Sequence, residues 1–152
     1  MTAIPDSVLV DRYVEEILNH ADFSRADEIL APEFIFRGPS TPAGLDRGGL
    51  QGFLEQTRAA FSNKRFTDLE RISEAGRVAL RFRMTGTQDG VFQGIPPLGV
   101  EIDVEGCDLI YIRGGRIAEV RAYFDLVAIV QKFLIPPPVR FVQQILQGLM
   151  RH

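Results

Sequence analysis

Apolar positions in the first part of the chain repeat with a helical period, which predicts three helices. The first helix is expected over residues 6–20, with Asp6 or Ser7 as its cap. A second, short helix follows His20 and ends at Pro32, and a third begins at Asp46. A short strand is predicted over 33–37, and the segment 39–49, rich in Gly and Pro, is predicted to be a loop. The apolar residues that carry the first and third helices are Val8, Leu9, Tyr13, Ile17 and Leu18, then Leu50, Phe53, Leu54 and Phe61.

The second half of the chain changes to a period of two, which is typical of strands. The clearest alternation runs from Val78 to Met84, and further strands are predicted over 66–74, 99–113 and 116–125. Helices followed by a largely antiparallel meander indicate an α+β fold, with helices packed on one curved sheet. Such a sheet can form a cone with an open mouth, where ligand pockets often lie.

Composition and charge limit the function classes. The chain has 152 residues, which suggests one domain, and its net charge of −3 argues against a nucleic-acid partner. A lone cysteine, Cys107, cannot form an internal disulfide and is expected to be a buried thiol. No signal-peptide pattern and no apolar run of membrane-spanning length are present, so a cytoplasmic location is expected.

The last predicted strand ends at Asp125, directly before the apolar run 126–130. One interpretation is a buried carboxylate with a raised pKa that moves protons as a general acid/base. The other is a helix cap, in which the side chain accepts hydrogen bonds from free backbone N–H groups. By parity Asp125 shares a strand face with Ile117, Glu119, Arg121 and Tyr123, and periodicity alone does not select the face that lines a pocket.

Several polar side chains are candidates for substrate binding, each with a structural alternative. Gln88 has the parity of Phe82 and Met84, a stripe expected to line the cavity, and it either binds a carbonyl or closes a loop. The tyrosine hydroxyls are candidates to stabilise an oxyanion or are core groups. The arginines are candidates to bind an anionic substrate group or form ion pairs. These four residues are Tyr111, Tyr123, Arg37 and Arg121.

Three segments carry a family resemblance: residues 11–34, 85–99 and 114–131. The middle one has the form Gly-Thr-x-x-Gly-x-Phe-x-Gly-x-Pro-Pro, with Gly86 as its first residue. Together they resemble the SnoaL-like polyketide cyclases of the NTF2-like superfamily. The resemblance implies an NTF2-like cone, in which a curved, mainly antiparallel sheet packs against three N-terminal helices.

The resemblance also implies homodimers, a deep hydrophobic pocket for a small molecule, and no metal or organic cofactor. It implies that an aspartate at the end of the last strand is the general acid/base of an intramolecular aldol ring closure, and Asp125 matches that position. It therefore selects the Asp125 face for the pocket and places Arg37 near the mouth. The chain departs from the family where Gln88 and Arg37 stand in place of histidine.

The chain is expected to divide into a domain over 1–132 and a tail over 133–152. The tail has a Pro136–Pro138 spacer and an amphipathic helix from Val139 to Met150. Residues 126–152 carry +3 from Lys132, Arg140 and Arg151, so residues 1–125 carry −6. The helix is expected to pack on the domain or a partner subunit, and contact with a membrane surface is a weaker alternative.

These observations predict a protein with a deep apolar pocket that catalyses aldol-type cyclisation of a polyketide-like molecule, with Asp125 as general acid/base. A ketosteroid-isomerase-like proton shift would use the same groups. The third alternative is a binding or interaction module without chemistry, in which Asp125 only caps a helix.

Overall fold

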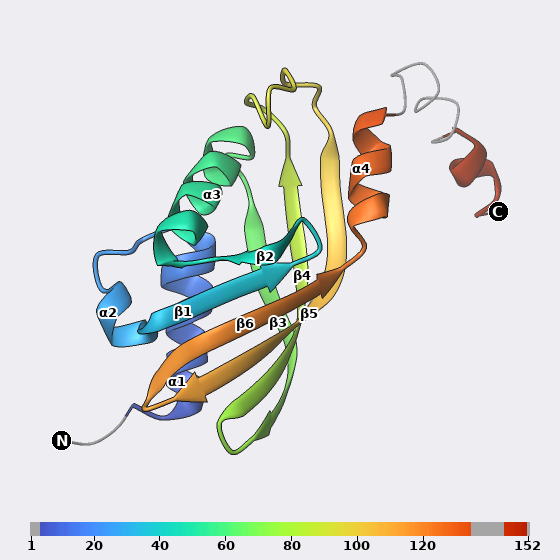
Figure 1. The fold of residues 1–152 in the computed structure, drawn as a ribbon. Helices are drawn as coiled ribbons and strands as arrows, with labels where there is room; N and C mark the ends of the chain where they lie inside the picture. Colours follow the sequence, from blue (N-terminus) through green and yellow to red (C-terminus); the bar gives the residue numbers. More distant parts are fainter. Residues whose placement is uncertain (1–3, 135–144, 152) are drawn as a thin grey trace.

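The computed structural model describes residues 4–134 and 145–151 and confirms the predicted α+β class, with helices packed on one curved sheet. One curved sheet of six strands has the order β2-β1-β6-β5-β4-β3, and helices cover its concave side (Figure 1). The helices are α1 (Asp6–Arg12), the π-helix η1 (Tyr13–Asn19), α2 (Ala26–Ile29), α3 (Arg47–Ala60) and α4 (Leu126–Leu134). The strands are β1 (Leu30–Gly38), β2 (Thr41–Leu45), β3 (Arg65–Glu74), β4 (Arg77–Thr87), β5 (Glu101–Arg113) and β6 (Arg116–Phe124).

The predicted first helix is a single rod whose second half is a π-helix. Tyr13 and Ile17 are fully buried there, and Asn19 fixes the end of the rod to β3. The amide of Asn19 donates to the carbonyl of Phe66 at 3.0 Å and accepts from its N–H at 2.8 Å. This two-way contact satisfies a buried side chain and sets the first helix against the sheet.

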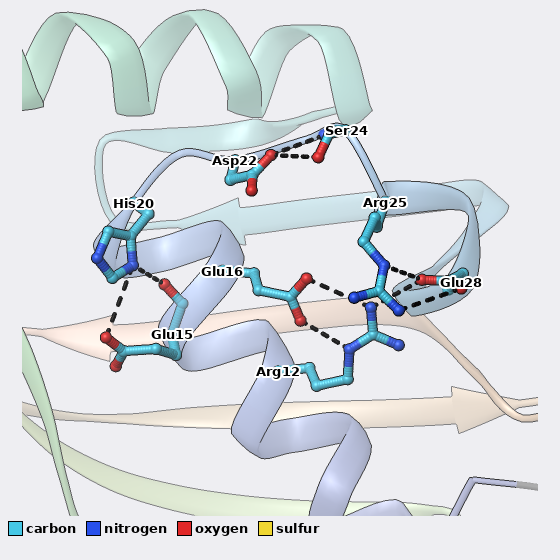
Figure 2. Close-up of polar contacts among 8 residues, drawn as sticks. All are labelled: Arg12, Glu15, Glu16, His20, Asp22, Ser24, Arg25 and Glu28. Atoms are coloured by element: carbon cyan, nitrogen blue, oxygen red, sulfur yellow. Dashed lines mark hydrogen bonds and ion pairs between the residues drawn. The ribbon is translucent and has the colours of Figure 1, made fainter.

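Ion pairs connect the first helix to the short helix α2 (Figure 2). Arg12 donates to Glu16 at 2.6 Å and reaches Glu28 at 2.8 Å, and Arg25 also contacts Glu28. His20 contacts the backbone carbonyl of Glu15 at the end of the rod. This cluster therefore positions the helical layer and lies outside the cavity described below.

The sheet is mixed, because β1 runs parallel to β6 while the other neighbours are antiparallel. The β4–β5 ladder pairs residues from Arg77↔Tyr111 to Thr87↔Glu101 without a register shift. At the β5–β6 turn Gly114 and Gly115 both have positive φ, the geometry that a tight hairpin requires.

Alternation along the strands separates a concave inner face from an outer face. On β6 the inner face contains Val120, Ala122 and Phe124, while Glu119 and Arg121 are on the outer face. Outer-face arginines of β4 form cross-strand ion pairs, including Arg83 with Asp103 at 2.6 Å. The inner face therefore meets the helices, and the outer face carries the charge.

One predicted loop contains a strand. Residues 41–45 of the segment 39–49 form β2, which pairs with the end of β1 through Phe36↔Leu45 and Gly38↔Thr41. The local sequence has Gly and Pro, which disfavour strands, but the open edge of β1 provides backbone partners. Asp46 then caps α3, accepting from the Gly49 N–H at 2.8 Å.

The predicted tail helix is described only in part. Residues 145–149 are helical, and the side chains of Ile145, Leu146, Leu149 and Met150 are exposed. The Pro136–Pro138 spacer and the start of the predicted helix lie outside the described residues. Among the helices that are described, none combines the length and apolar character needed to cross a bilayer.

Candidate functional site

A cavity of about 390 Å³ lies between the inner face of the sheet and the helices α3 and α4. Eight of the eleven phenylalanines in the chain line it. Phe82 and Met84, both predicted to line a cavity, are among the lining residues, as is Phe36 from β1. Aromatic rings favour a flat, apolar ligand, which can stack on them or meet their edges.

Gly106 shapes the wall next to Phe82. A Cβ at this position would lie 2.5 Å from the Tyr123 carbonyl oxygen and 2.6 Å from the Phe82 ring. The Phe82 ring occupies the space that any larger residue would need, and it stacks on Phe66 with ring centroids 4.4 Å apart. The sheet wall is therefore closely packed at this point, directly beside the cavity.

A buried carboxyl group, that of Asp108, also lines the cavity. Asp108 is on β5, opposite Leu80 of β4 and Ala122 of β6, and its residue surface is only 2% exposed. Burial disfavours the charged form and raises the pKa of Asp108 from 3.8 to about 8. Within the described part of the chain, no side chain or backbone N–H donates to this carboxyl group, so desolvation is the cause of the shift.

Sequence reasoning missed Asp108, although the chain contained a signal for it. Asp108 has the parity of Ile102, Ile110 and Ile112, the inner positions of the predicted strand 99–113. A carboxylate in register with buried isoleucines is costly unless it has a role. The signal was therefore the alternation within β5, the strand that precedes β6 and Asp125.

The prediction that Asp125 lies buried at the pocket is wrong. Asp125 is exposed and follows β6, and its carboxylate accepts from the Ala128 N–H at 2.9 Å. Asp125 therefore caps α4, which is the second of the two interpretations given for this residue. The residue after it, Leu126, does line the cavity.

The face of β6 that was predicted to line the pocket is also wrong, because the residues between the predicted ones are those that line the cavity. Ala122 and Phe124 line the cavity, so Arg121 and Tyr123 are on the outer face and both are exposed. Tyr111 of β5 is on the same outer face, where the Arg121 guanidinium lies 6.0 Å from its ring centroid. Arg37 is on this face too, 3.8 Å from Glu119. The structure groups these four residues together, but outside the cavity.

Gln88 is fully buried and holds a loop. Its amide nitrogen donates to the carbonyls of Ile95 and Pro96, and its oxygen accepts from the Leu98 N–H at 3.2 Å. Gln88 does not line the cavity. Of the two alternatives for this residue, the geometry therefore matches loop closure.

The loop that Gln88 holds contributes its own residues to the cavity. Phe92 meets Phe61 edge to face with centroids 5.5 Å apart, and stacks against Phe133 of α4 at 6.4 Å. Gln93 lines the cavity with a backbone φ of 52°, an uncommon conformation for a residue other than glycine. The loop and α4 thus cover one end of the cavity together.

Lys64 is the second ionisable group among the described lining residues, and sequence reasoning missed it as well. It lies in the turn between α3 and β3, and its ammonium contacts the Thr57 hydroxyl at 3.4 Å. Desolvation, with a smaller contribution from the charge of Arg58, lowers its pKa to about 8. In residues 4–134 and 145–151, no cluster of three or more His, Cys, Asp or Glu side chains could hold a metal ion.

The family model of the SnoaL-like polyketide cyclases matches residues 8–133, and the chain belongs to this family. No curated protein matches it in sequence. A candidate SnoaL-like polyketide cyclase from Jannaschia sp. CCS1 is 26% identical, with a TM-score of 0.74 over 86% of this chain and 92% of that one. IdmH, a candidate polyketide cyclase from Streptomyces antibioticus, is 24% identical, with a TM-score of 0.72 over 85% of this chain and 98% of that one. AclR from Streptomyces galilaeus, a candidate hydroxylase, has the same fold at 20% identity, with a TM-score of 0.70 over 86% and 96%.

Proposed function

We propose that the protein catalyses an aldol-type ring closure of a polyketide-like molecule, with Asp108 as the general acid/base. The observation that carries the proposal is a carboxyl group of raised pKa on the wall of an aromatic cavity. A base of higher pKa removes a proton from carbon more readily, and the apolar wall excludes water from the intermediate. Family membership supports the reaction class.

The reaction needs one proton acceptor that later becomes the donor. The Asp108 carboxylate removes a proton from a carbon next to a carbonyl, which breaks the C–H bond and forms an enolate. The enolate carbon attacks a second carbonyl of the same molecule, which forms the C–C bond and leaves an alkoxide. Asp108 then returns its proton to the alkoxide, so the enzyme ends the cycle unchanged.

Polar groups on the cavity wall are available to stabilise oxygen charge as it develops. Ser40 comes from the β1–β2 turn, Thr41 from the start of β2, Thr85 from β4 and Gln93 from the loop after β4. Each carries a side-chain donor, and fixed donors in a cavity that excludes water stabilise an enolate strongly. We therefore assign the stabilisation of the enolate oxygen to these groups, and no longer to Tyr111, Tyr123 and Gln88.

The activity is expected to increase with pH up to about 8. Asp108 acts as a base only when ionised, and its pKa of about 8 leaves roughly a tenth of the molecules ionised at pH 7.

Proton abstraction can be tested before the natural substrate is known. The probe is 2-tetralone in D₂O, and the measurement is the rate of deuterium incorporation next to its carbonyl. Wild-type protein and Asp125→Asn are expected to accelerate the exchange. In Asp108→Asn the exchange rate is expected to fall at least 100-fold, because general acid/base catalysis contributes a factor on the order of 10²–10⁴. Equal rates for wild type and Asp108→Asn would refute the role of Asp108.

A further inference from the structure

Lys64 is an unusual residue to find on the wall of this cavity. It is half-buried, and its ammonium has one polar contact among the described residues, the neutral hydroxyl of Thr57. That hydroxyl is itself oriented by donating to the Leu54 carbonyl at 3.0 Å. Partial burial of an ammonium without a carboxylate partner costs free energy, which an anion bound in the cavity would offset.

The strand register separates the backbone rows beside which the two ionisable residues lie. Asp108 pairs with Leu80 in the β4–β5 ladder, whereas Lys64 lies against Gly86, where an added Cβ would be 3.4 Å from the Lys64 Cα. Gly86 pairs with Ile102, six residues before Asp108 on β5. At a rise of about 3.3 Å per residue, the two rows are roughly 20 Å apart along the strand. The wall between them is apolar and includes Phe82 and Met84.

We propose that Lys64 determines substrate class: it binds a carboxylate at one end of an elongated, flat, apolar substrate whose other end reaches Asp108. The aromatic wall receives the ring system, and the ammonium at its far end selects acids over their neutral esters. Lys64 is a specificity-determining residue and takes no part in proton transfer. This inference rests on the cavity being the substrate site in the proposed function.

The surroundings of Lys64 strengthen the selection. Apolar neighbours such as Phe61 lower the local dielectric constant, so an ion pair formed there is stronger than one on the surface. Desolvation and Arg58 already bring the pKa of Lys64 to about 8, so most molecules carry the charge at pH 7. A bound carboxylate would raise that pKa, and binding would therefore take up protons above pH 8.

The test uses a matched pair of unreactive probes, anthraquinone-2-carboxylate and its methyl ester. Dissociation constants are measured by calorimetry at pH 7 for the full chain and for the variants Lys64→Met, Lys64→Arg and Arg58→Gln. Wild type is expected to bind the acid about tenfold more tightly than the ester, the size of one charge-assisted hydrogen bond. Lys64→Met should no longer bind the acid more tightly than the ester, and its affinity for the ester should be unchanged.

The controls separate Lys64 from general electrostatics. Lys64→Arg keeps the charge and should keep the preference for the acid. Arg58→Gln removes a nearby, exposed guanidinium group, which donates a hydrogen bond to the His20 carbonyl. This variant too should keep the preference for the acid. Raising the pH from 7 to 9.5 should weaken the preference in wild type and leave it unchanged in Lys64→Arg.

Two results would overturn the inference about Lys64: an unchanged acid preference in Lys64→Met, or no acid preference in wild type. Neither result affects the exchange experiment with Asp108→Asn, which does not depend on Lys64. Conversely, an acid preference that disappears in Lys64→Met would stand even if 2-tetralone failed to exchange. The two proposals can therefore fail separately.

Discussion

The Tyr13 hydroxyl is buried and has no hydrogen-bond partner among the described residues, although the carboxyl group of Asp108 is close enough to raise the pKa of Tyr13 further. Burial is the larger cause of that shift, since the Tyr13 side chain is fully enclosed by the core. Tyr13 begins the π-helix η1, and irregular turns of this kind are frequent at functional sites. In the part of the chain that the structure describes, a hydroxyl and a carboxyl group that both lack a hydrogen-bond partner are therefore near neighbours in the core.

We expect Tyr13→Phe to leave the free energy of unfolding unchanged or to raise it by up to about 1 kcal/mol. The hydroxyl is desolvated on folding and gains no hydrogen bond in return, so its removal takes away a cost. Urea unfolding monitored by circular dichroism measures the difference. Tyr111→Phe on the outer face is the control and should change little. A loss of more than about 1 kcal/mol in Tyr13→Phe would show that the hydroxyl has a stabilising partner after all.

The contribution of Asp108 to the stability of the protein should decrease as the pH rises from about 4 to 8. The unfolded carboxyl group loses its proton near pH 3.8, whereas the folded one keeps it until about pH 8. The unfolded state therefore binds fewer protons over this range, and stability decreases by at most about 1.4 kcal/mol per pH unit. Below pH 4 the two states bind the same number of protons at this site and the effect vanishes.

Asp108→Asn isolates this contribution, because the amide does not titrate. The difference in free energy of unfolding between Asp108→Asn and wild type should move in favour of the variant as the pH rises to 8. Denaturant unfolding at pH 5, 6, 7 and 8 measures the trend. A difference that stays constant over these four pH values would mean that Asp108 is not desolvated.

The cap on α4 gives a prediction for Asp125. Asp125→Ala removes the acceptor for the Ala128 N–H and is expected to destabilise α4 by about 1 kcal/mol. Asp125→Asn keeps a capping oxygen and should stay within about 0.5 kcal/mol of wild type. Because α4 covers part of the cavity through Ile129 and Phe133, Asp125→Ala should also weaken binding of the anthraquinone probes. Equal stability of the Ala and Asn variants would argue against the cap.

The periodicity of the chain was sufficient to predict most of the elements. The alternation from Val78 to Met84 predicted β4, and Gly114-Gly115 predicted the hairpin before β6. These features are local, because side-chain alternation and positive φ at glycine depend on neighbours in sequence. The strand β2 was missed because its hydrogen bonds come from the edge of β1 and not from its own residues.

The site was harder to predict, because a strand has two faces and β6 is partly apolar on both. The choice between Asp125 and Asp108 depends on which face meets the helices, and a shift of one residue reverses that choice. Lys64 could not be recognised from its neighbours in sequence either, since its burial comes from packing against α3 and β4.

The sequence by itself therefore determined the α+β class, the family and the order of all the strands except β2, since these follow from local periodicity and motif. Only the tertiary structure decided that Asp108 and Lys64 share a cavity while Asp125, Arg121 and Tyr123 are on the surface. The physical reason is desolvation: the pKa of a carboxyl or an ammonium group depends on what surrounds it in space, and the curved sheet sets those surroundings.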